Sequence, residues 1–98
     1  MIATLPTQEQ VDRVARDLAP DVVRIRLDVT TDWTDDPALY FRVTLSDEAS
    51  RRRPLRDVTG LVRAKVAEEL RLEELDRHPY FRFRSYSEQA ELLDLAWA

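Results

Sequence analysis

The chain has 98 residues, 44% of them apolar, and a formal net charge of −4. This length suits one small domain over residues 1–98, and the apolar fraction is typical of a globular chain rather than a disordered one. The acidic balance argues against bulk attraction to nucleic acid or anionic lipid, and the lack of cysteine excludes disulfides and zinc–thiolate sites.

No apolar run approaches the ~20 residues that a membrane-spanning helix needs. The opening segment MIATLPTQEQ has neither a basic start nor a long apolar stretch, so we expect no secretion signal and a cytoplasmic protein. The basic residues are 14 arginines and the single Lys65. This bias reflects either a GC-rich genome or a need for planar, bidentate hydrogen-bond donors.

The first predicted element is a helix from Thr7 to Ala19. Thr7 and Gln10 fit a capping box at its start, and Pro20 ends it. The apolar residues of this segment recur at helical spacing and form one stripe: Val11, Val14, Ala15 and Leu18.

Two strands are expected next, over Val22–Thr30 and Leu39–Leu45. Alternation in the first strand predicts a buried side made of Val23, Ile25, Leu27 and Val29. The second strand repeats the pattern with Leu39, Phe41, Val43 and Leu45. The segment TDWTDDPA between them is rich in turn formers, which indicates a hairpin with a long tip.

A second helix is expected from about Leu55 to Leu70, after the irregular segment SDEASRRRPLRD. Its apolar stripe consists of Leu55, Val58, Val62, Val66 and Leu70. Gly60 lies inside this helix and costs about 1 kcal/mol relative to alanine.

The stretch PYFRFRSYSEQ predicts a third strand, Tyr80–Arg84, that buries Phe81 and Phe83. Ser85 and Glu88 fit a second capping box, which opens a last helix running toward Trp97. Ala90, Leu93 and Trp97 share one face of that helix. It either docks on its own sheet or presents apolar surface to a partner or a second copy.

The element order α-β-β-α-β-α predicts a two-layer α+β sandwich with a three-stranded mixed or antiparallel sheet and helices on one face. The helical crossover makes the third strand parallel to the second. The third strand can pair with the second strand, or with the first in antiparallel fashion, and the sequence leaves both orders open.

The polar sides of the three strands place charged and aromatic residues on one face: Arg24, Arg26, Asp28, Tyr40, Arg42, Thr44, Tyr80, Arg82 and Arg84. Five arginines and one aspartate give this face a charge of +4 in a chain of −4. It is either a solvated face of long side chains or a contact surface for an acidic partner or for phosphates.

Three other segments each allow two interpretations. Trp33 on the hairpin tip either folds back onto the core or is an exposed anchor for a partner. The aspartates beside it are either ordinary turn residues or ligands for a hard cation, although their spacing does not match an EF-hand. The basic run RRRP, Arg51–Pro54, is either a solvated loop or an anion site at a helix start.

The sequence offers no catalytic constellation. His78 is the only histidine and has no partner that the sequence identifies, and Gly60 is the only glycine, which rules out a glycine-rich phosphate loop. We therefore expect a non-catalytic chain without a cofactor or a metal.

Four segments together resemble a group of short uncharacterised bacterial proteins: LAPDVVRIR, DWTDDPALYFRVTLSDEAS, PYFRFRSYSEQAEL and the closing AWA. Proteins of that group look like partners of small all-helical HEPN-domain proteins, encoded in pairs reminiscent of toxin–antitoxin systems. The resemblance covers most of the chain but contributes no catalytic residue. It implies that this chain is the non-catalytic member of such a pair.

The leading hypothesis is a protein-binding module, antitoxin-like, that contacts a cognate helical ribonuclease-type protein. The residues expected to make the contact are Arg24, Arg26, Trp33, Tyr40, Arg42, Tyr80, Arg82, Arg84 and Trp97. The alternative is a domain that contacts RNA or DNA with the same arginine-rich sheet face.

Overall fold

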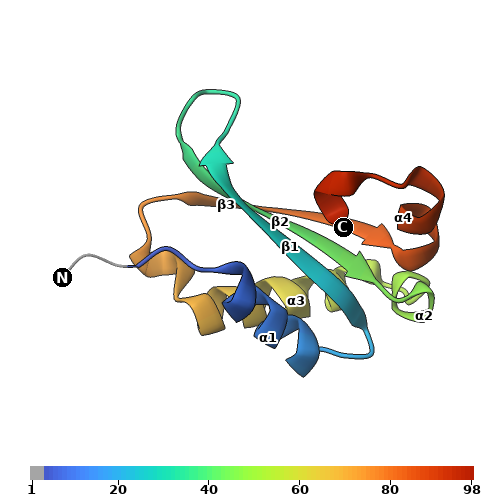
Figure 1. The fold of residues 1–98 in the computed structure, drawn as a ribbon. Coiled ribbons are helices and arrows are strands. Elements are labelled where there is room, and N and C mark those ends of the chain that lie inside the picture. The colour runs from blue at the N-terminus through green and yellow to red at the C-terminus, as the bar shows by residue number, and fades with distance from the viewer. Residues whose placement is uncertain (1–3) are drawn as a thin grey trace.

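Two helices pack against one face of a three-stranded sheet, which confirms the predicted α+β sandwich (Figure 1). The computed structural model describes residues 4–98. Its elements are α1 (Gln8–Asp17), β1 (Val22–Thr31), β2 (Pro37–Leu45), α2 (Asp47–Ser50), α3 (Leu55–Leu70), η1 (Leu72–Glu74), β3 (His78–Ser85), α4 (Tyr86–Leu92) and η2 (Leu95–Trp97). The predicted bounds of α3 are met at both ends. Within residues 4–98, no helix is long and apolar enough to cross a membrane.

Helix α1 begins at the predicted capping box, in which the Thr7 hydroxyl accepts from the Gln10 backbone and the Gln10 side chain accepts from the Thr7 backbone. Its buried residues, Val11, Val14 and Ala15, face the sheet. The side chain of Gln8 forms two hydrogen bonds to the backbone of β1, which the sequence pattern does not predict. Its Nε2 donates to the Ile25 carbonyl at 2.7 Å, and its Oε1 accepts from the Leu27 N–H at 2.8 Å. Gln8 thus satisfies backbone groups on the free edge of β1.

Strands β1 and β2 form the expected antiparallel hairpin, but the buried side of β1 differs from the prediction at its start. Val22, not Val23, is buried opposite Leu45, and Val23 is 46% exposed. The cause is a register irregularity between Val22 and Arg24, which inserts one residue and reverses the alternation before Ile25. At the far end of β1, Val29 is 39% exposed because the hairpin extends past the helices.

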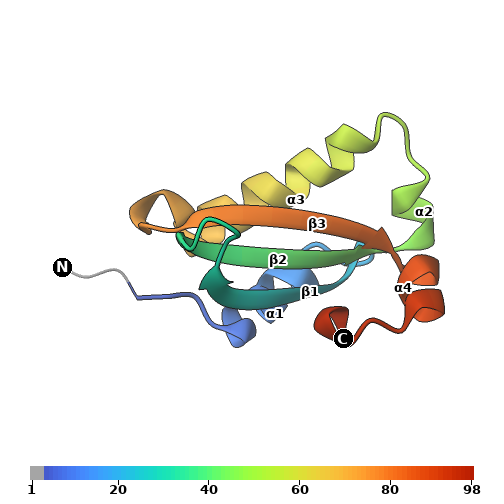
Figure 2. The same ribbon diagram turned by 90° about the horizontal axis from the view of Figure 1, so that it is seen from above.

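Strand β3 pairs with β2 in parallel, which settles the order β1-β2-β3 (Figure 2). The centre of the core is the helix-facing side of β2, where Leu39, Phe41 and Val43 are fully buried. Phe81 and Phe83 face the same layer but are only partly buried, since β3 is an edge strand. The Arg63 guanidinium from α3 lies over both phenylalanine rings, 6.0 and 5.2 Å from their centroids.

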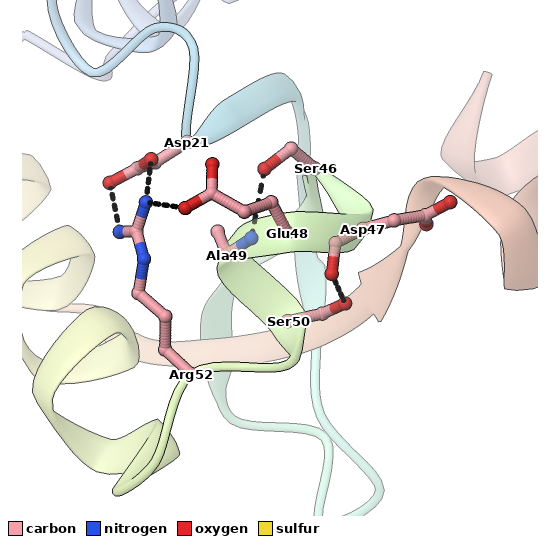
Figure 3. Close-up of polar contacts among 7 residues, drawn as sticks. All are labelled: Asp21, Ser46, Asp47, Glu48, Ala49, Ser50 and Arg52. Carbon is pink, nitrogen blue, oxygen red and sulfur yellow. Dashed lines mark hydrogen bonds and ion pairs between the residues drawn. The ribbon is translucent and has the colours of Figure 1, made fainter.

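A short helix that the sequence analysis did not predict, α2, lies between β2 and α3. The Ser46 hydroxyl caps it by accepting from the Ala49 N–H at 3.1 Å. Arg52, just after α2, donates to both carboxylate oxygens of Asp21 and to Glu48 (Figure 3). The Arg52 hydrogen bonds are the main reason that the pKa of Asp21 is lowered. This network ties the start of β1 to the β2–α3 connection.

The prediction of one continuous last helix toward Trp97 is wrong, because α4 ends at Leu92. The second capping box, Ser85 with Glu88, is present and starts α4, but Leu93 adopts a left-handed backbone with φ 53° and ends the helix. The chain then turns back over the sheet as the C-terminal segment, Leu93–Ala98. In Figure 1 this red segment lies on the side of the sheet opposite α1 and α3.

Candidate binding face

The sheet face turned away from α1 and α3, called here the open face, carries its polar side chains in rows across the strands. Arg26 is the register partner of Arg42, and Arg42 is the register partner of Arg82. Each strand therefore contributes one arginine to a single arginine row (Arg26, Arg42 and Arg82). The alternation of the three strands predicts which residues share the face, but only the observed register places these three side by side.

Two further rows flank the arginine row. Toward the hairpin tip, Tyr40 is the register partner of both Asp28 and Tyr80. Toward the C-terminal segment, Thr44 is the register partner of both Arg24 and Arg84. The open face thus changes from aromatic to basic along the strands over about 13 Å, at roughly 3.3 Å per residue.

The charges of the open face are only partly balanced. Arg42 meets Asp28 at a long 3.5 Å, and Arg84 donates to Asp94 at 3.2 Å. Arg24, Arg26 and Arg82 are exposed and make no ion pair with any residue in the described range 4–98. Asp94 is a contribution that the sequence analysis missed, because only the returning C-terminal segment brings it to the sheet.

The aromatic end of the open face is organised around Tyr80. The Tyr40 ring stacks on the Tyr80 ring with centroids 5.0 Å apart and planes 16° apart. The His78 and Trp33 rings lie against Tyr80 at tilted angles, with centroids at 4.5 and 5.6 Å. The rings of Tyr40 and Tyr80 are therefore in contact with aromatic neighbours within the chain, whereas Trp33 is 78% exposed.

The hairpin tip (Asp32–Asp36) is held over this cluster by the Asp32 carboxylate. Asp32 accepts from the Thr34 N–H and hydroxyl, from the Asp36 N–H, and from the Tyr80 hydroxyl at 2.9 Å. The pKa of Asp32 is lowered to about 2, chiefly by the Thr34 hydroxyl. Desolvation, followed by the bond to Asp32, raises the pKa of Tyr80. These bonds fix the direction in which Trp33 projects.

The C-terminal segment covers the opposite end of the open face. Trp97 is 5% exposed, and the Arg84 guanidinium lies 4.4 Å from the centroid of its ring. Arg84 also donates to the Gln89 side chain at 3.1 Å. Trp97 docks on the sheet, which is the first of the two alternatives expected for this end of the chain. Three leucines nevertheless stay exposed at 58, 76 and 86%, namely Leu92, Leu93 and Leu95.

The predicted contact residues therefore fall into three groups. The arginine row lies in the middle of the face, and Arg24 lies next to it, in the row toward the C-terminal segment. Those at the tip end are Trp33, Tyr40 and Tyr80. Arg84 and Trp97 contact each other, and Trp97 lies too deep for a partner to reach while the C-terminal segment stays in place. His78 belongs to the tip group, and its pairing with Ala38 in the β2–β3 register is what brings it there.

The two other charged segments are occupied by contacts within the chain. In the basic run, Arg52 is bound to Asp21 and Glu48, and Arg53 donates to the Ser50 and Arg52 carbonyls. In the tip, Asp32 organises the turn. In the part of the chain that the structure describes, no group of three or more His, Asp or Glu side chains is placed to hold a metal ion.

Comparisons of the chain with protein-family models, with curated proteins and with solved structures found no match.

Proposed function

We propose that the chain is a non-catalytic protein-binding module whose open face contacts a negatively charged surface of a cognate protein. The observation that carries this proposal is the arginine row, in which Arg26 and Arg82 are exposed without a carboxylate partner in residues 4–98, in a chain whose net charge is −4. Unpaired guanidinium groups are strong donors for carboxylates and gain most when a partner excludes water from them.

The tip end of the face favours a protein partner. Tryptophan, tyrosine and arginine are the residues most enriched among interface hot spots, and Trp33 projects from a tip whose hydrogen bonds fix its direction. An exposed but oriented tryptophan loses little freedom on binding, which makes it a good anchor for an apolar pocket.

The resemblance of the chain to partners of HEPN-domain proteins supports a more specific proposal. The cognate protein would be a small helical ribonuclease-type protein, and this chain its antitoxin-like neutraliser in the bacterial cytoplasm. The open face would contact an acidic surface of the helical protein. This chain would then neutralise its partner by non-covalent binding and would not modify it chemically.

A single-stranded nucleic acid is the second candidate for the same face. The arginine row spans three strands, which is wide enough to follow a phosphate backbone. The tip offers fewer free rings for stacking bases, because Tyr40 and Tyr80 are stacked on each other, whereas Trp33 is 78% exposed. The negative net charge also opposes a polyanion.

The test is co-purification with the product of the neighbouring gene, followed by titration of the pair by calorimetry. We expect Trp33→Ala and Arg82→Glu each to weaken binding at least tenfold, in line with hot-spot losses of about 2 kcal/mol. Arg13→Glu is the matched control, since Arg13 is exposed on α1, in the layer on the other side of the sheet.

A salt titration separates the two candidates. Nucleic-acid affinity falls steeply with salt because each neutralised phosphate releases counterions. A protein interface anchored by Trp33 should lose much less over the same range. The proposal fails if the pair does not form, or if neither variant affects it; a steep salt slope with a nucleic acid would favour the second candidate.

A further inference from the structure

The open face carries two oppositely charged features that match each other. The hairpin tip holds three carboxylates, Asp32, Asp35 and Asp36, around the exposed Trp33. Farther along the same face lies the arginine row. Because the Tyr80 hydroxyl binds Asp32, and Trp33 touches the Tyr80 ring, the tip leans over the open face rather than away from it.

The spacing of these features suits a two-fold axis. The tip stands over the His78 and Tyr80 positions, and the arginine row lies two to four residues farther along β3, which is about 7–13 Å. A two-fold axis that lies between two facing sheets and runs across the strands would place the tip of each copy on the arginine row of the other. A symmetric interface makes each such contact twice.

The two ends of the face leave room for this arrangement. Figure 1 shows the hairpin tip and the C-terminal segment rising at opposite ends of the sheet on the same side. Beside the arginine row lies a hollow of about 210 Å³, lined in part by Arg26, Arg42 and Leu95. Leu95 is 86% exposed, so this hollow offers an indole ring both an apolar contact and guanidinium groups.

We infer that the chain forms a symmetric dimer through its open face, with the acidic tip of each copy on the arginine row of the other and Trp33 in the hollow beside Leu95. A second copy is a suitable partner for this face, because the same chain carries the acidic tip, the arginine row that the tip would contact, and the exposed Trp33. The inference goes beyond the proposed function and does not depend on it. Since the same arginines are used, self-association and capture of the cognate protein would compete.

The edges of the sheet offer a different route to a dimer, and the test must separate the two. Gln8 occupies backbone groups of the β1 edge, while the β3 edge stays open. Pairing two β3 strands would bring Arg82 and Arg84 of both copies close together, which like-charge repulsion disfavours.

The experiment measures the self-association constant of the purified chain alone by sedimentation equilibrium at low and moderate salt. We expect a dimer that weakens as salt rises. Trp33→Ala and the pair Arg26→Glu with Arg82→Glu should each weaken it at least tenfold, and Arg13→Glu should leave it unchanged. All these positions are exposed, so the substitutions should not disturb the fold. Circular dichroism of each variant checks this.

A charge-exchange mixture gives the sharper readout. The row variant carries Arg26→Glu and Arg82→Glu. The tip variant carries Asp36→Lys and Asp35→Asn, because asparagine tolerates the left-handed backbone of Asp35, φ 69°. Each variant alone should associate poorly. Their equimolar mixture should form a heterodimer at least tenfold more tightly than either variant forms its own dimer, since one contact then joins an acidic tip to an intact arginine row and the other no longer joins like charges.

A chain that stays monomeric at millimolar concentration would overturn the inference. So would a dimer that the row and tip variants leave intact, because it would use another surface such as the β3 edge. Neither outcome bears on capture of the cognate protein, which is measured separately with the partner present.

Discussion

The two hydrogen bonds from the Gln8 side chain to β1 should stabilise the folded chain, and the variant Gln8→Met tests this. Replacing Gln8 with methionine keeps the length of the side chain and its helix propensity but removes both hydrogen bonds to β1. The Ile25 carbonyl and the Leu27 N–H would then have to find water at a partly buried position.

The expected loss follows from the two bonds. Each hydrogen bond contributes a net ~0.5–1.5 kcal/mol, so the free energy of unfolding should fall by about 1–3 kcal/mol. The contacts are partly buried rather than fully enclosed, which places the value in the lower half of that range. For a domain of about this size, a loss of about 1–2 kcal/mol should lower the melting temperature by roughly 4–16 °C.

Urea unfolding and amide hydrogen exchange together test this account. We expect a lower urea midpoint with an unchanged slope, and faster exchange of the Leu27 amide than of amides in β2. Glu9→Met is the matched control, because Glu9 is exposed in the same helical turn and its side chain makes no hydrogen bond to β1 among residues 4–98. If Gln8→Met leaves both the midpoint and the Leu27 exchange rate unchanged, the Gln8 contacts do not stabilise the edge.

Three further predictions concern stability. Gly60→Ala should raise the free energy of unfolding by about 1 kcal/mol, measured by urea titration, because Gly60 lies within α3 and an added Cβ would meet no atom within 4 Å beyond the adjacent backbone of the helix; a destabilised variant would contradict this. Trp97→Ala should cost up to about 3 kcal/mol and speed amide exchange in the C-terminal segment, whereas Leu95→Ala, at an 86% exposed position, should cost less than about 0.5 kcal/mol; equal effects would refute the docking of Trp97. Acid should destabilise the chain, because the folded pKa of three carboxyls lies below the usual value, namely Asp21, Asp32 and Asp47. Their contribution is complete above about pH 5 and is lost progressively as pH falls, in the case of Asp32 down to its folded pKa of about 2, so Asp32→Asn should flatten the fall of the urea midpoint between about pH 5 and 2, and an unchanged slope would exclude Asp32 as a cause.

Local patterns predicted those parts of the fold that local contacts decide. Both capping boxes join residues three apart in the chain, and the hydrogen bonds that Thr7 and Ser85 accept are the expected ones. The short helix α2 was missed although Ser46, followed by two acidic residues, is a usual helix start. Four residues are too few for apolar periodicity to reveal.

Tertiary contacts decided the features that the patterns missed. The extra residue at Val23 reverses the alternation of β1, and a period of two cannot show where such a shift falls. Helical spacing of Ala90, Leu93 and Trp97 indicated one continuous helix, but docking Trp97 on the sheet requires the chain to turn at Leu93. The stacking of Tyr40 on Tyr80 depends on the β2–β3 register, which no local pattern contains.

The arginine row has a consequence for the chain as it is being made. Its three members come from β1, β2 and β3, and β3 follows β2 in the chain only after α2, α3 and η1. The β1–β2 hairpin can form early on an emerging polypeptide, because its contacts are local. The complete row exists only after β3 has left the ribosome and closed onto β2. Any partly folded chain in which β3 is still unpaired therefore lacks the complete row, and the binding face is assembled in the same step that completes the sheet.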